Sequence, residues 1–160
     1  MHTSLGIFFL ILLTALGPVA RAADVSSPDY LIKEGRGLSH IYLDMPLEDA
    51  IRATGEPDQN LYGFVFVRKL ADGTQLSYRI ADNLLVSLNF KGDARSKYVT
   101  ARDARLGMSR SKILQLYGSP EAEAVNKVFY YSQGISFFFK DDVLYDISVF
   151  PQKTSVPSGR

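Results

Sequence analysis

Residues Leu106 to Glu121 read LGMSRSKILQLYGSPE, and residues Leu43 to Asp58 read LDMPLEDAIRATGEPD. Four pairs of identical residues share one separation of 63 positions: Leu43/Leu106, Met45/Met108, Gly55/Gly118 and Pro57/Pro120. A repeat of this kind indicates that each copy is one supersecondary unit. The sequence therefore predicts two units of the same architecture in tandem.

Each copy is predicted to begin with a short helix. Ser109 is a good N-cap for the second helix, and Gly118 followed by Pro120 is a strong stop signal. In the first copy Pro46 replaces the serine, so Asp44 is expected to cap that helix. Helices of about nine residues are too short to be stable alone. Each helix is therefore expected to pack on a sheet.

Three strands in an antiparallel meander are predicted to follow each helix, which makes the predicted fold class α+β. Ala71-Asp72-Gly73 and Ser132-Gln133-Gly134 are predicted to be three-residue hairpin loops. The predicted strands cover residues 64–70, 74–80 and 84–90 in the first copy, and residues 128–131, 135–139 and 143–150 in the second.

Alternation of side chains along these strands assigns residues to the face under the helices. In the first copy these residues are Phe66, Leu76, Tyr78, Ile80, Val86, Leu88 and Phe90. In the second copy they are Phe129, Tyr131, Ile135, Phe137, Phe139, Tyr145, Ile147 and Val149.

The N-terminal residues are typical of an export signal. Leu5 to Leu16 is an apolar run too short to span a bilayer, and Ala20-Arg21-Ala22 fits a cleavage site. We therefore expect a periplasmic or secreted protein without a membrane anchor after cleavage. The predicted organisation is a signal peptide (1–22), an N-terminal segment (23–40), repeat 1 (41–90), a linker (91–105), repeat 2 (106–150) and a flexible tail (151–160).

The second copy resembles the SmpA/OmlA (BamE-like) family of outer-membrane assembly lipoproteins. The resemblance rests on Leu106-Gly107-Met108-Ser109, Gly118-Ser119-Pro120, Tyr130-Tyr131, the run Phe137 to Asp142, and Val143-Leu144 through Ile147. It implies a helix-plus-meander fold and a role in envelope assembly. Two features depart from the family: the chain has no cysteine to lipidate, and it carries two copies. Tandem copies are similar in architecture to the secreted β-lactamase inhibitory proteins, whose aromatic sheet grips an enzyme.

The composition argues against several kinds of chemistry. The chain has no cysteine, and His40 is the single histidine after the signal, which excludes cysteine nucleophiles and multi-histidine metal sites. Asp141-Asp142 is expected to be a solvated turn, because the spaced oxygen ligands of a calcium loop are missing. Lys and Arg (18) balance Asp and Glu (17), which argues against nucleic acid as a partner. We expect no catalytic residue, cofactor or metal.

Aromatic residues supply the remaining functional signal. The chain has nine Tyr and ten Phe, and some are predicted to lie on the face opposite the helices. The residues predicted to bind a partner there are Tyr130, Phe138, Phe150, Val128 and Leu144. We expect a non-catalytic module that binds a protein partner of the cell envelope. The alternatives are a secreted enzyme inhibitor, and a small envelope enzyme or binder of lipid or peptidoglycan. The oligomeric state is left open.

Overall fold

The computed structural model describes residues 28–153. The predicted signal peptide, residues 1–22, and the last part of the predicted tail, residues 154–160, lie outside the described residues. Among the described residues, no helix is long and apolar enough to cross a membrane.

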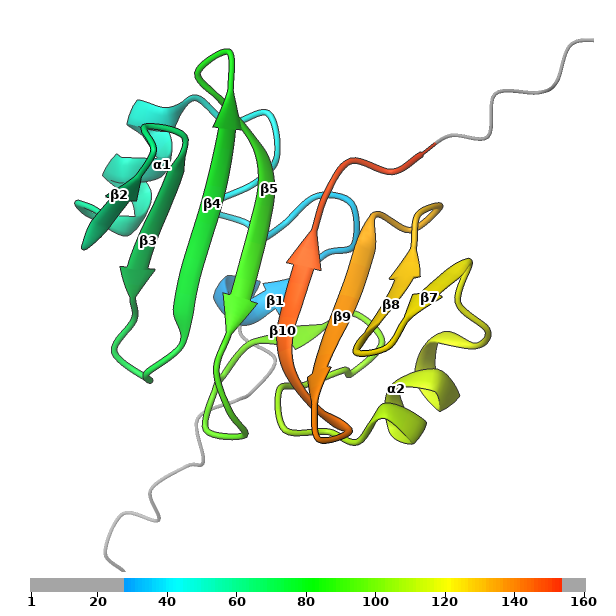
Figure 1. Ribbon diagram of the computed structural model, residues 1–160. Helices are drawn as coiled ribbons and strands as arrows, with labels where there is room; N and C mark the ends of the chain where they lie inside the picture. The colour runs from blue at the N-terminus through cyan, green and yellow to red at the C-terminus, as the bar shows by residue number, and fades with distance from the viewer. Residues whose placement is uncertain (1–27, 154–160) are drawn as a thin grey trace, which may run out of the picture.

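An eight-stranded antiparallel sheet dominates the molecule (Figure 1). Its strands follow the spatial order β2-β3-β4-β5-β10-β9-β8-β7. The N-terminal strands are β2 (Gln59–Leu61), β3 (Val65–Lys69), β4 (Gln75–Ala81) and β5 (Leu84–Lys91). The C-terminal strands are β7 (Ala122–Ala124), β8 (Lys127–Tyr130), β9 (Ile135–Lys140) and β10 (Val143–Val149).

The predicted fold of two tandem helix-plus-meander repeats is wrong. The described residues are mostly β: eight of their ten strands form one continuous sheet, and the two helices have only eight residues each. Strands β5 and β10 pair at the centre, from Lys91 opposite Asp146 to Leu88 opposite Val149. Each would otherwise present an edge of unpaired backbone groups, so their pairing satisfies both. The short strands β2 and β7 were not predicted at all.

Two helices cover one face of the sheet. Helix α1 (Leu47–Thr54) precedes β2, and α2 (Arg110–Tyr117) precedes β7. The Ser109 hydroxyl accepts a hydrogen bond from the Lys112 amide, which confirms the predicted cap of α2. At α1 the N-cap position is Pro46, without a side-chain cap, so the predicted capping by Asp44 is wrong.

Each helix is tied to the sheet through a two-residue turn. Asp82-Asn83 joins β4 to β5, and Asp141-Asp142 joins β9 to β10, with positive φ at all four residues. Such turns match the twist of antiparallel strands. The Asn83 carbonyl accepts a hydrogen bond from the Leu47 amide, and the Asp142 carbonyl accepts one from the Arg110 amide. These carbonyls therefore satisfy amides that the first helical turn leaves unpaired.

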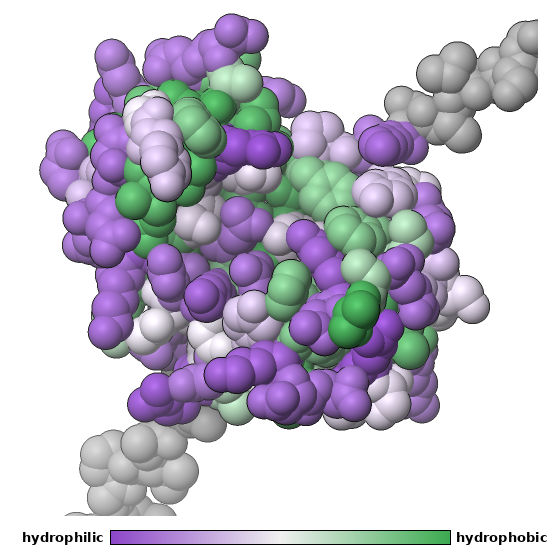
Figure 2. Space-filling model, in the orientation of Figure 1, coloured by the Kyte–Doolittle hydropathy of each residue, from purple (hydrophilic) through white to green (hydrophobic). Residues whose placement is uncertain are grey.

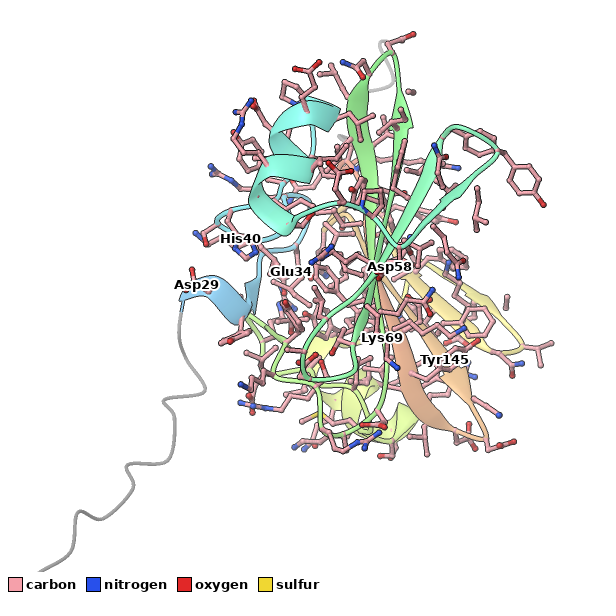
Figure 3. The ribbon with its side chains drawn as sticks, turned by 90° about the vertical axis from the view of Figure 1, so that its left-hand side faces the viewer. Asp29, Glu34, His40, Asp58, Lys69 and Tyr145 are labelled. Carbon is pink, nitrogen blue, oxygen red and sulfur yellow. The ribbon has the colours of Figure 1, made fainter. Side chains whose placement is uncertain are left out.

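The N-terminal segment packs on the same side as the helices (Figure 3). The short strands β1 (Leu31–Ile32) and β6 (Val99–Thr100) form a small parallel sheet behind the large one. Ile32 and Leu38 are buried, as are Tyr98 and Ala104 in the stretch predicted to be a linker. The stretches 28–40 and 91–105 therefore both contribute residues to the core.

Candidate functional site

The face of the large sheet turned away from the helices carries the candidate site. We call it the open face. Figure 3 shows Tyr145 on this side of the sheet and His40 and Glu34 on the other. The register sets its side chains in cross-strand rows. One row runs Lys69, Gln75, Lys91, Asp146, Phe138, Lys127, and the next runs Val67, Ser77, Asn89, Ser148, Ser136, Phe129.

A hollow of about 390 Å³ lies over the centre of the open face. Figure 2 looks onto this face and shows polar surface in the middle, between more apolar margins. The lining residues come from both halves of the sheet: Val65, Arg79, Ser87, Asn89, Lys127, Phe129, Tyr131, Ser136, Ser148, Phe150 and Lys153. We refer to this set as the hollow.

Small polar side chains form the floor of the hollow. The Ser148 hydroxyl donates a 2.5 Å hydrogen bond to Asn89 Oδ1, which links β10 to β5. Ser136 on β9 is only 1% exposed, and its hydroxyl has no hydrogen-bond partner among the described residues. A buried hydroxyl without a partner carries a desolvation cost, so Ser136 is a donor that a ligand atom could satisfy.

Aromatic rings stack along the wall that β8 and β10 supply. Phe129 and Tyr131 are stacked with ring centroids 5.3 Å apart, and Phe150 lies 6.1 Å from Tyr131. The Lys153 ammonium lies 4.5 Å from the Tyr131 ring centroid, and the Lys127 ammonium lies 5.0 Å from that of Phe129. Cations held over ring faces gain attraction from the ring without losing their charge.

The opposite wall of the hollow combines an exposed cation with an apolar margin. Arg79 on β4 is exposed, and Val65 lies beside it on β3. Val65 pairs with Leu61 on β2, which is 41% exposed, so the apolar margin continues to the edge of the sheet. The adjoining turn exposes Tyr62 (87%) and Phe64 (46%). The open face therefore offers contact area on both sides of the hollow.

Asp146 is the acidic side chain of the row beside the hollow. Burial raises the pKa of Asp146 to about 6, and the nearby ammonium groups of Lys127 and Lys91 oppose that rise. Its Oδ1 atom is buried without a hydrogen-bond partner among residues 28–153. The carboxyl of Asp146 therefore gains and loses its proton at mildly acidic pH.

The structure separates the five residues predicted to bind a partner. Phe138 and Phe150 lie on the open face, where Phe138 packs against Tyr145 with ring centroids 5.1 Å apart. Val128, Tyr130 and Leu144 are buried in the core on the helix side, with at most 1% of their surface exposed. The predicted orientation of these three is wrong.

One extra loop residue accounts for the error on β8. Tyr130 pairs directly with Ile135, so the loop has four residues, 131–134, where three were predicted. Because side chains alternate, a shift of one residue exchanges the two faces of a strand. Phe129 and Tyr131 consequently face the hollow, and Tyr130 faces α2, where its hydroxyl donates a hydrogen bond to the Gly118 carbonyl.

Two bulges account for the errors on β5 and β10. The register shifts between Leu144 and Asp146, which turns Leu144 inward and Tyr145 toward the open face. A matching shift between Arg79 and Ile80 buries Leu85 in place of the predicted Val86. Bulges leave little trace in a sequence, so these positions could not have been assigned from alternation alone.

The sequence-based prediction missed four cationic or aromatic residues of the hollow. Lys127 and Lys153 lie just outside the predicted strands, and Phe129 and Tyr131 were assigned to the face under the helices. The register places Ser136, Asp146, Ser148 and Asn89 on the open face. Among the described residues, no group of three His, Asp or Glu side chains could hold a metal ion.

Comparison with known proteins gives one structural similarity. No family model matches the chain, so the resemblance to the SmpA/OmlA family rests on the motif residues alone. No curated protein matches either. The crystal structure of a "putative beta-lactamase inhibitor protein" from Streptococcus mutans is similar over 68% of this chain and 84% of that chain, with 13% sequence identity and a TM-score of 0.27. A similarity of that size carries no argument about function.

Proposed function

We propose that this chain is an exported, non-catalytic protein that binds a protein partner of the cell envelope through the open face. The observation that carries the proposal is the hollow itself. It combines stacked aromatic rings, cations that form no ion pair and an apolar margin on a sheet face that no described helix or strand covers. Aromatic anchors and arginine surrounded by polar residues are the usual composition of a binding hot spot.

Enzyme inhibition is the second form that this binding could take. An inhibitor would present the same open face to an enzyme and block its substrate site. The two forms differ in what happens to the partner, because an envelope-assembly partner keeps any activity it has, whereas an inhibited enzyme loses turnover. A small envelope enzyme, or a binder of lipid or peptidoglycan, is the third class and needs no protein partner.

Capture from an envelope extract separates these classes. The immobilised wild-type chain should retain a protein, which mass spectrometry identifies, and Phe138→Ala should retain much less of it. Tyr42→Ala is the matched control, because Tyr42 is an exposed aromatic residue in the segment on the helix side. Loss of turnover by a retained enzyme would assign inhibition.

Two results would contradict the proposal. Equal retention by wild type and Phe138→Ala, with both proteins folded, would place the binding surface elsewhere. Retention of no protein, together with thermal stabilisation of the chain by a lipid or a peptidoglycan fragment, would assign the third class instead.

A further inference from the structure

Charge is distributed unevenly around the hollow. The chain as a whole carries 18 basic and 17 acidic residues. The lining of the hollow nevertheless contains Arg79, Lys127 and Lys153 and not one Asp or Glu. These three cations come from β4, β8 and the stretch after β10, so the register of the sheet brings them together around one opening. A cluster of one sign in a concave surface focuses the field on that opening.

None of the three cations forms an ion pair within the described residues. The four ion pairs found in residues 28–153 involve Arg52, Arg95, Arg105 and Arg110. Lys127 and Lys153 are placed by aromatic faces instead, and Arg79 is exposed. Lys127 acts on the Asp146 carboxyl and Lys153 on the Glu121 carboxyl without forming an ion pair, so the three cations remain available to attract an anionic group that enters the hollow.

The floor offers hydrogen-bond donors in addition to charge. The buried Ser136 hydroxyl lines the hollow without a partner. Asn89 accepts the Ser148 hydrogen bond with Oδ1, which leaves its amide nitrogen as a donor. A carboxylate accepts hydrogen bonds at both oxygens and pairs with ammonium and guanidinium groups. Charge and donors thus match the same chemical group.

We propose that the hollow is a carboxylate pocket, which binds an Asp or Glu side chain on an exposed loop of the protein partner. This inference rests on the proposed function and specifies the chemistry of the partner. The volume of about 390 Å³ suits a few side chains, and the apolar margin at Val65 suits a hydrophobic neighbour of the acid. Residues 154–160 contain Arg160 and no Asp or Glu side chain, so this stretch offers the hollow no acidic side chain.

A pair of short peptides tests the pocket without a known partner. The probes are acetyl-Gly-Glu-Leu-Glu-Gly-amide and its counterpart with Gln in place of Glu, titrated into the isotopically labelled chain and followed by NMR. The Glu peptide should bind at least about tenfold more tightly, because it alone can pair with the cations. Its largest shifts should fall on the amides of Lys127, Ser136 and Ser148, and its affinity should fall as salt is added.

Two matched variants make the test specific. The double variant Arg79→Gln, Lys127→Gln should lose the preference for the Glu peptide. Lys112→Gln should keep it, because Lys112 is exposed on α2, on the opposite side of the sheet. Melting temperatures of both variants near that of wild type would show that the fold is intact.

Several outcomes would overturn the carboxylate pocket. Equal binding of the two peptides, or shifts confined to residues outside the hollow, would exclude it. Tighter binding of single-stranded oligothymidylate than of the Glu peptide at the same salt concentration would assign the cations to nucleic acid. Tighter binding of the chain to phosphatidylglycerol vesicles than to the Glu peptide would assign the cations to a lipid headgroup.

The pocket and the proposed function can fail separately. If Phe138→Ala abolishes partner capture while the double variant captures normally, the open face binds a protein and the pocket is wrong. If the Glu peptide binds the hollow but the chain captures no protein, the pocket is correct and the proposed function fails.

Discussion

The N-terminal strands β2–β5 and the C-terminal strands β7–β10 are alike on the covered face and different on the open face. Each set packs under one eight-residue helix, which ends at a glycine with positive φ, Gly55 or Gly118. On the open face the N-terminal strands present Val65, Ser77 and Arg79, whereas the C-terminal strands present Phe129 and Phe138.

This difference separates what the fold needs from what it leaves free. The covered positions in both sets are apolar and buried, because each helix must pack on something. The open positions are not constrained in that way, and within the strands the aromatic residues of the open face belong to the C-terminal set. An aromatic residue that packing does not require is a candidate for binding.

Phe137→Ala should give the largest loss of stability and test the assignment of faces on β9. Phe137 is fully buried, with its ring centroid 4.7 Å from that of Tyr117 on α2. Truncating a buried phenylalanine costs about 3–5 kcal/mol. Phe138→Ala should cost much less, because Phe138 lies on the open face. Denaturant unfolding of both variants measures the difference, and equal large losses would mean that both faces of β9 are buried.

Asp146→Asn should stabilise the chain at neutral pH, which tests the electrostatics of the C-terminal strands. The folded pKa of about 6 lies above the ordinary value of 3.8, so the folded state holds the proton more tightly than the unfolded state. The stability contributed by Asp146 is therefore present below about pH 4 and is lost as the pH rises toward 6. At pH 7 the free energy of unfolding of the Asn variant should exceed that of the wild type by on the order of 2 kcal/mol.

The control for Asp146→Asn is the same pair of proteins at low pH. Near pH 4 the gain should shrink, because Asp146 is then neutral in the folded wild type. Thermal melts of the two proteins are compared at each pH across this range, because the difference between them removes the contributions of the other titrating groups. A gain that does not change with pH would show that the side chain is not a perturbed acid.

Gly118→Ala should give the smallest of these effects and tests the helix ends. Gly118 has φ of 79°, a conformation that strains a residue with a Cβ atom, but an added Cβ would meet nothing within 4 Å. The free energy of unfolding should fall by about 1 kcal/mol because of backbone strain alone. Gly55→Ala should cost at least as much, because its Cβ would also lie 2.9 Å from the Arg68 guanidinium. Unchanged melting temperatures in both would refute this account of the helix ends.

Local features of the fold could be predicted, and long-range ones could not. The α2 cap at Ser109, the turn at Asp141-Asp142 and the buried Phe137 follow from short-range rules. The pairing of β5 with β10 could not be predicted, because it brings together residues as distant in sequence as Asn89 and Ser148, which are 59 positions apart. From the sequence, each of these strands was expected to be the edge of a separate sheet. A pattern confined to one strand does not show which distant strand lies beside it.

The candidate site was only partly predictable for the same reason. Alternation correctly assigned Phe138 and Phe150 to the outer face. On β8, one extra loop residue reversed the two faces, so that Phe129 lies on the open face and Tyr130 on the helix side. The cations of the hollow come from positions as distant as Arg79 and Lys153, so their gathering depends on the whole sheet. Their convergence is therefore a property of the tertiary structure.

The affinity of the captured partner for Phe138→Ala tests the central claim most directly. Isothermal titration with the wild type, Phe138→Ala and the control Tyr42→Ala gives the three dissociation constants. If the aromatic residues of the C-terminal strands form the binding surface, Phe138→Ala should lose about 2 kcal/mol or more of binding free energy, and Tyr42→Ala should bind as wild type does. Unchanged affinity of a folded Phe138→Ala would contradict the account.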